Sequence, residues 1–295
     1  MPPEIDAEEI SIKDLFLMVW GRKFLIAGFG LTFGVLAGLM AFSLPPKYEA
    51  SAVLALTADS SASGALGSAG ALLSQFGGLA ALGGFGLGSS GKKSEAIATL
   101  SSAALTEGFI RDRNLLPVLY PKDWDASKKQ WKNPDQTKHP TVWTAERMFD
   151  KKVRTVREDK KTGLITLSIR LENPAQAAEW VTELINRTNS RLRQQAIEQS
   201  QHNLDYLHDQ LKQTSVVELQ QAIYGLIETE IKQVMIAKGS EQFAFRIIDP
   251  ARVPEKKVSP KRGLMILLGG FAGIIMGLLL TFLLPSKSKT PQRAA

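Results

Sequence analysis

The sequence contains no cysteine and little histidine. The first absence excludes disulfide bonds, cysteine-ligated zinc and thiol catalysis. The histidines are His139, His202 and His208, and the last two are six positions apart, which places them on nearly opposite sides of a helix. Two metal-binding histidines on one helix are typically four apart. We therefore expect His202 and His208 to be solvated helix residues, and we predict neither a metal site nor a cofactor.

Motifs for catalysis or nucleotide binding are also missing. Residues 86–91 match the G-x-G-x-x-G pattern, and residues 86–93 nearly match a phosphate loop, but Lys93 replaces the Ser or Thr that binds magnesium. Both spacings fall within a glycine-rich tract, where they arise by chance. We interpret Glu228 and Glu230 as exposed charges on an amphipathic helix, and no serine, histidine and aspartate set stands out. We therefore predict that the protein is not an enzyme.

The formal net charge of +7 would fit a nucleic-acid partner, but basic residues that flank two long apolar runs explain it more simply. The runs cover residues 24–44 and 263–284 and contain no charged residue. Each has about 20 residues, enough for a helix to cross a hydrocarbon core of roughly 30 Å. The sequence therefore predicts two transmembrane helices and no nucleic-acid partner.

Basic residues beside the runs indicate the orientation in the membrane. Arg22 and Lys23 precede the first run and predict a cytoplasmic N-terminus. The second run is ambiguous, because basic residues flank it on both sides. Since the first helix usually dominates, we expect both termini in the cytoplasm and the middle of the chain outside. A signal peptide cleaved near residues 50–52 is the alternative, which the long run and the acidic leader disfavour.

Both apolar runs carry glycine at every fourth position. These residues are Gly30, Gly34 and Gly38 in the first run and Gly269, Gly273 and Gly277 in the second. Glycines at this spacing form a groove in which two helix backbones approach closely. We predict that they pack transmembrane helices, within one chain or between chains; the alternative is that glycine is simply common in membrane helices.

The residues between the runs predict a mixed α+β domain. We expect an antiparallel hairpin of residues 153–157 and 164–171, because apolar and polar residues alternate in its second strand. Residues 243–248 are predicted to form a strand that joins a strand at residues 47–57. Helices are expected at residues 94–109 and 141–150, separated by an irregular stretch at residues 117–140.

A long helical pattern begins at Asn173, which suits an N-cap and is followed by a proline. The helix is expected to run about 40 residues, or roughly 60 Å, to a break near residues 214–215. A second helix then returns to Gly239. We expect a projecting arm that packs side by side with partners as a coiled coil. Its predicted packing residues are Val181, Ile185, Leu192, Ile197, Leu204 and Leu211.

Three further features have more than one interpretation or a special role. The tract at residues 60–91 is either a loosely ordered loop that packs against a neighbour or the lining of an assembly's interior. The aromatic faces of Trp124, Trp131 and Trp143 can stack on sugars, but we favour burial. Proline favours an extended backbone, so a stiff connector should lead into the second run. It contains Pro250, Pro254, Pro260 and Arg262.

The predicted domain order follows from these elements. It comprises a cytoplasmic leader (1–23), a first transmembrane helix (24–44), a periplasmic domain (45–262), a second transmembrane helix (263–284) and a cytoplasmic tail (285–295). Within the periplasmic domain we expect a base (45–172 and 240–262) and a helical arm (173–239).

This arrangement resembles the Wzz-type chain-length determinants, also called polysaccharide co-polymerases. The residues that carry the resemblance are Pro46–Ala50 after the first span and Ile248–Ala251, Val253–Pro254 and Ser259–Arg262 before the second, and Glu95–Leu100 and Leu115–Pro117 also fit. Larger relatives append a cytoplasmic tyrosine autokinase after the second span. No Walker motif follows it here, so the chain is similar to the kinase-free kind. The long glycine-rich insert departs from the shorter members.

The resemblance implies a Gram-negative inner-membrane protein that forms a homo-oligomeric ring and catalyses nothing. Such rings set the modal length of O-antigen, a part of lipopolysaccharide, or of a related surface glycan. A membrane polymerase makes this glycan as a lipid-linked polysaccharide. One alternative is an adaptor for capsule or exopolysaccharide export that works with a separate tyrosine kinase. A two-span sensor is another, but it needs an output domain that the short tail does not supply.

Overall fold

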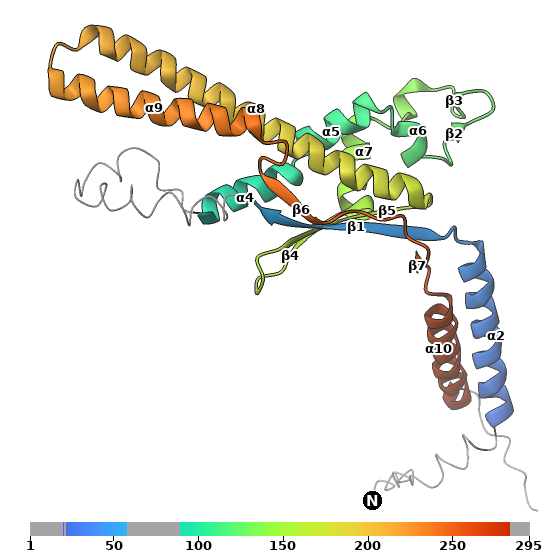
Figure 1. Cartoon of the computed structure of the whole chain (residues 1–295). Helices are drawn as coiled ribbons and strands as arrows, with labels where there is room; N and C mark the ends of the chain where they lie inside the picture. Colours follow the sequence, from blue (N-terminus) through green and yellow to red (C-terminus); the bar gives the residue numbers. More distant parts are fainter. Residues whose placement is uncertain (1–19, 21, 58–88, 284–295) are drawn as a thin grey trace, which may run out of the picture. The chain divides into compact units, whose positions relative to one another are not determined.

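The computed structural model describes residues 20, 22–57 and 89–283 (Figure 1). The chain divides into two compact units, one of residues 48–256 and one of residues 1–47 together with 257–295. Most of the predicted leader, most of the glycine-rich tract with the first three residues of its G-x-G-x-x-G match, and the predicted tail lie outside the described residues.

An antiparallel sheet organises the first unit, with strand order β4-β5-β1-β6 (Figure 1). These strands are β1 (Lys47–Leu56), β4 (Arg154–Glu158), β5 (Ile165–Leu171) and β6 (Phe245–Asp249). β1 is central, because Ala50 lies opposite Ile169 of β5, and Leu54 lies opposite Ile247 of β6. The structure thus confirms the predicted hairpin and the predicted pairing of the last strand with the first.

Short helices follow β1 along the chain. They are α4 (Ser89–Leu100), α5 (Ala103–Asp112), α6 (Leu116–Leu119) and α7 (Val142–Met148), which a π-turn (Phe149–Val153) follows. The single helix predicted at residues 94–109 is wrong, because the chain breaks after Leu100 and α5 starts anew. The hydroxyl of Ser102 caps α5 by accepting a hydrogen bond from the Leu105 amide at 3.2 Å. A small hairpin, β2 (Trp124–Asp125) with β3 (Gln130–Trp131), lies between α6 and α7.

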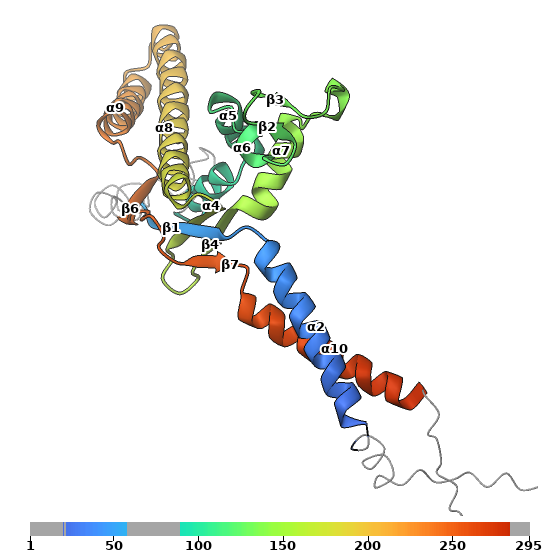
Figure 2. The ribbon, with the colours of Figure 1, turned by 90° about the vertical axis from the view of Figure 1, so that its right-hand side faces the viewer.

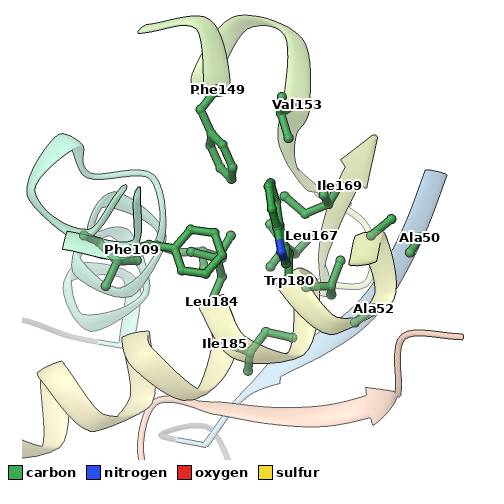
Figure 3. Packing of buried hydrophobic residues seen from close by; sticks show 14 of the residues in the cluster. Ala50, Ala52, Phe109, Phe149, Val153, Leu167, Ile169, Trp180, Leu184 and Ile185 are labelled. Carbon is green, nitrogen blue, oxygen red and sulfur yellow. The ribbon is translucent and has the colours of Figure 1, made fainter. Parts of the chain in front are cut away.

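The core lies between the sheet and the helices that cover it. Ile165, Leu167 and Ile169 alternate along β5 and are fully buried, as the sequence pattern predicts. Figure 3 shows Leu167 and Ile169 beside Trp180, which packs edge-on against Phe109 with ring centroids 5.4 Å apart. Residues from α5, β5 and α8 therefore share one hydrophobic core.

Two long helices complete this unit. α8 (Pro174–Gln213) has 40 residues, and α9 (Val217–Gly239) returns beside it (Figures 1 and 2). The side chain of Asn173 caps α8 by accepting a hydrogen bond from the Ala175 amide at 3.0 Å. The predicted start, length, break and return of the arm are confirmed.

The second unit contains two apolar helices, α2 (Lys23–Ser43) and α10 (Arg262–Leu283), and the short strand β7 (Lys257–Ser259). Both helices are long and apolar enough to cross a membrane. They lie next to each other in Figure 1 and cross each other in Figure 2, and their backbones are in contact. Together with the sheet and the long helices, they confirm the predicted α+β fold with an apolar helix toward each end.

Candidate functional site

The glycines of α10 lie in close contact with α2. A side chain at Gly273 would meet the backbone of α2, because an added Cβ would lie 2.9 Å from Cα of Gly30 and 2.8 Å from Cβ of Phe33. At Gly277 the added Cβ would lie 2.9 Å from Cα of Ile26, and at Gly269 it would lie 3.0 Å from the carbonyl oxygen of Phe33. Real Cβ atoms do not approach so closely, so this glycine row allows the two backbones to meet.

The glycines of α2 have a different environment. An added Cβ at Gly30 would lie 3.0 Å from the Cγ1 methylene of Ile274, but the nearest atoms to an added Cβ at Gly34 and Gly38 would lie 3.8 Å and 3.5 Å away. Gly34 and Gly38 therefore have room for a methyl group. They line an open apolar groove along the helix pair, together with Ile266 of α10. The two predicted glycine rows thus do not pack symmetrically against each other.

Basic residues mark both ends of this helix pair. At one end the guanidinium of Arg262 lies over the ring of Phe42, 4.3 Å from its centroid. At the other end the guanidinium of Arg22 donates to the carbonyl oxygen of Thr281 at 3.4 Å, and the ammonium of Lys23 lies over the Trp20 ring at 5.1 Å. Such cation and aromatic pairs are typical of the boundary between lipid and water.

The three prolines of the predicted connector lie outside the helices. Pro250 and Pro254 follow β6 in irregular backbone, Pro260 stands between β7 and α10, and Arg262 is the first residue of α10. Proline cannot donate a backbone hydrogen bond, which accounts for the end of the sheet ladder at Asp249.

The six predicted arm residues divide into two groups. Val181, Ile185 and Leu192 are buried in the core with the sheet, which differs from the expected role in arm packing. Ile197, Leu204 and Leu211 are half-buried in the later part of α8. A helical period predicts that a face is buried, but it does not say which neighbour buries it. The part of α8 outside the core therefore begins well after Asn173.

Burial of Glu230 within the pair α8 and α9 contradicts the sequence prediction of an exposed charge. Its side chain is 4% exposed, and one carboxylate oxygen accepts a hydrogen bond from the amide of Asn203 at 2.9 Å. The other oxygen, Oε2, has no hydrogen-bond partner among the described residues. Glu228 is exposed as predicted and pairs with Lys232 at 2.6 Å.

Ion pairs join α5 to the beginning of α8. Arg113 donates to Glu179 and Glu183, and Arg187 donates to Glu183 and to Asp112. Burial opposes ionisation of Glu183, but hydrogen bonds from Arg113 and Arg187 outweigh it and hold the pKa of its carboxyl below the usual value. This cluster fixes α5 on α8 and resembles a structural ion network rather than a catalytic pair.

Arg154 is a buried charge that sequence reasoning missed. Its guanidinium donates to the carbonyl oxygens of Leu100 and Ser101, to the hydroxyl of Thr106 and to the carboxylate of Asp150. All these bonds measure 2.7 to 2.9 Å. Because Arg154 holds the break between α4 and α5, its role is structural.

The tryptophans and the two helix histidines differ in how well their predicted burial or exposure agrees with the structure. Trp124 packs edge-on against Trp131 with centroids 5.0 Å apart, and both are half-buried. Trp143 is 59% exposed beneath the guanidinium of Arg147, which contradicts its expected burial. His202 and His208 are solvated, as predicted. Across residues 22–57 and 89–283, no group of three histidine or acidic side chains is placed to hold a metal ion.

Comparisons with known proteins give two matches to family models. Residues 8–112 match the model described as "Wzz: Chain length determinant protein". Residues 207–285 match the model described as "GNVR: G-rich domain on putative tyrosine kinase". The first match includes α2 and β1, and the second includes α9, β6 and α10.

The chain is also similar to solved structures, each at 11% identity. A "full-length bacterial polysaccharide co-polymerase" aligns over 92% of this chain and 96% of its own, with a TM-score of 0.39. A fragment of WzzB, a polysaccharide co-polymerase from Salmonella Typhimurium, aligns over 72% of this chain and all of its own, with a TM-score of 0.27. No curated protein matches. On the two family-model matches, the chain carries a Wzz chain length determinant domain and a GNVR domain, which confirms the resemblance found in its sequence.

Proposed function

We propose that this chain is a non-enzymatic regulator of glycan chain length in the bacterial inner membrane. In this proposal α2 and α10 cross the membrane, the termini are cytoplasmic, and the residues between the helices form a periplasmic domain. The observation that carries it is the Wzz domain match, which spans the apolar helix α2 and the central strand β1. The glycan is O-antigen of lipopolysaccharide, which a membrane polymerase extends as a lipid-linked polysaccharide.

We further propose that the chain acts as a homo-oligomeric ring. Support comes from α9, where Val217, Tyr224 and Ile231 repeat every seven residues and Met235 follows one turn later. All four side chains are exposed, and they form a stripe beside the face that packs on α8. Such a stripe on a water-facing helix favours contact with another helix, and a second copy would supply one.

The test of chain-length control is a gel of lipopolysaccharide from cells with and without the gene. We expect a cluster of long bands of modal length to collapse to a random ladder when the gene is deleted. Expression of the intact chain should restore the cluster. The variant Ile231→Asp should shift the modal length and reduce the oligomer size in detergent, because it places a charge in the apolar stripe. Gln233→Asp is the matched control on another face of α9. Equal oligomer size for both variants would contradict assembly through the stripe.

The GNVR match favours a second candidate function, an adaptor for capsule or exopolysaccharide export that works with a separate tyrosine kinase. The same cells distinguish the candidates. An unchanged lipopolysaccharide ladder with loss of secreted polysaccharide would support the export adaptor and contradict control of O-antigen length.

A further inference from the structure

An open apolar groove runs along α2 and α10. Its volume is about 530 Å³. Gly34 and Gly38 form its floor because they have no side chains, Leu31 and Val35 line it from α2, and Ile266 and Ile274 line it from α10. All four of the larger side chains are exposed, so the groove opens toward the surroundings of the helix pair.

The dimensions of the groove suit one hydrocarbon chain. From Ala27 to Gly38 a helix rises about 16 Å, close to one leaflet of a hydrocarbon core roughly 30 Å thick. The volume then corresponds to a mean cross-section of about 30 Å², far below the roughly 80 Å² of a helix that is 10 Å wide. A single acyl chain therefore fits the groove better than a third helix does.

The end of the groove carries a cation. Residues four apart share one face of a helix, so Arg262 lies one turn beyond Ile266, and Phe42 lies one turn beyond Gly38, both on the groove's face. The guanidinium rests on the Phe42 ring, and no described carboxylate pairs with it. Its Nε is buried without an acceptor in the described part of the chain. An anionic headgroup at this end would supply the missing negative charge.

We propose that this groove binds one acyl chain of an anionic phospholipid of the bilayer, with the lipid phosphate held by Arg262. The inference goes beyond the proposed function, because it requires only that α2 and α10 lie in a membrane and does not depend on which glycan is regulated. A bound lipid would cover the only part of the α2 glycine row that α10 leaves open within the described structure.

The experiment measures lipid binding to the purified full-length chain in neutral detergent by native mass spectrometry. The probes are phosphatidylglycerol and phosphatidylcholine with the same acyl chains. We expect one phosphatidylglycerol per chain, with Gly34→Leu weakening binding about tenfold because its side chain fills the groove. Gly28→Leu is the matched control, since Gly28 lies on α2 with open space around it. Arg262→Gln should abolish the preference for phosphatidylglycerol, whereas Lys261→Gln should retain it.

Three outcomes would overturn the proposal. One is equal phosphatidylglycerol binding by Gly34→Leu and Gly28→Leu. Another is displacement of phosphatidylglycerol by an equimolar polyprenyl phosphate, which would assign the groove to a different lipid. The third is loss of oligomers in Gly34→Leu without loss of lipid, which would assign the groove to a helix of a second copy. Gly38→Leu repeats the test at the other glycine of the groove floor. Arg262→Gln tests binding of the lipid headgroup without adding bulk to the groove.

Discussion

The helix pairs α2–α10 and α8–α9 are both antiparallel, but they bring their helices together in different ways. In α2–α10 the backbones meet, because Gly269, Gly273 and Gly277 leave no side chain between them. In α8–α9 side chains fill the interface, including Ile223 and Ile227 of α9 and the polar pair of Asn203 and Glu230.

The difference follows from the solvent each pair is expected to have. Water drives large apolar side chains together, so α8 and α9 can be held by buried isoleucine and half-buried leucine side chains. Lipid gives no such driving force, since its chains are as apolar as leucine, and close backbone packing becomes the main attraction. Small residues in one pair and large residues in the other are therefore two solutions to the same topological problem.

The largest expected effect is the loss of α2–α10 packing in Gly273→Leu. The new side chain would enter the backbone of α2 at Phe29 and Gly30, so we expect a cost of at least about 3 kcal/mol, the upper end for overpacking. Because the chain has no cysteine, the pair Gly38→Cys and Ile266→Cys provides a disulfide reporter. A Cβ atom at position 38 would lie 3.5 Å from Cγ1 of Ile266, so the two side chains are neighbours.

Two further variants make this test specific to the row on α10. Gly28→Leu adds the same side chain to α2 in open space, and Gly34→Ala adds a methyl group that the groove accommodates. We expect both to form the reporter disulfide as the parent does, while Gly273→Leu forms little. Similar disulfide yields in Gly273→Leu and Gly28→Leu would mean that the glycine row does not hold the pair together.

The next effect concerns the polar pair inside α8–α9. Asn203→Ala would leave the buried carboxylate of Glu230 without its hydrogen bond, so we expect a loss of about 2 kcal/mol in the free energy of unfolding. This should lower the melting temperature of the full chain by about 4 to 8 °C in a circular dichroism melt.

The double variant Asn203→Leu with Glu230→Leu distinguishes this explanation from simple loss of packing. Replacing both polar groups by apolar ones removes the desolvation cost, so stability should return to the parent value or exceed it. A double variant less stable than Asn203→Ala would show that the polar pair contributes more than an apolar interface would.

The same comparison explains what the sequence could predict. Strand alternation in Ile165–Leu171 and the cap at Asn173 are local signals, and the structure has both features as expected. The glycine spacing is local too, but whether a row contacts a backbone or lines a groove depends on the rotation of the partner helix. That rotation is set by all side chains along the contact, so Gly34 and Gly273 are indistinguishable in the sequence.

Buried charges were the second failure of sequence reasoning. Arg154 and Glu230 stand in ordinary polar contexts, and their burial depends on residues far away, such as Leu100 for Arg154 and Asn203 for Glu230. The break in the helix predicted at residues 94–109 had a weak local signal in Ser102, a favourable N-cap residue. A regular apolar spacing across Leu100 and Leu105 concealed it.

The smallest expected effect concerns the ion pairs that join α5 to α8. No such ion pair joins the described residues of α2 to those of α10. Because the pKa of Glu183 is lowered in the folded state, its contribution is present above the unfolded pKa of about 4.3 and is lost as pH falls through the folded value. Glu183→Gln should therefore lower the free energy of unfolding at pH 7 by less than about 1 kcal/mol. The difference from the parent should vanish in acid, as denaturant titrations between pH 7 and pH 3 would show.

Glu228→Gln is the control, since Glu228 pairs with Lys232 only at the surface of α9. A difference for Glu183→Gln that persists unchanged at low pH would mean that packing of the side chain, and not its charge, connects α8 to α5.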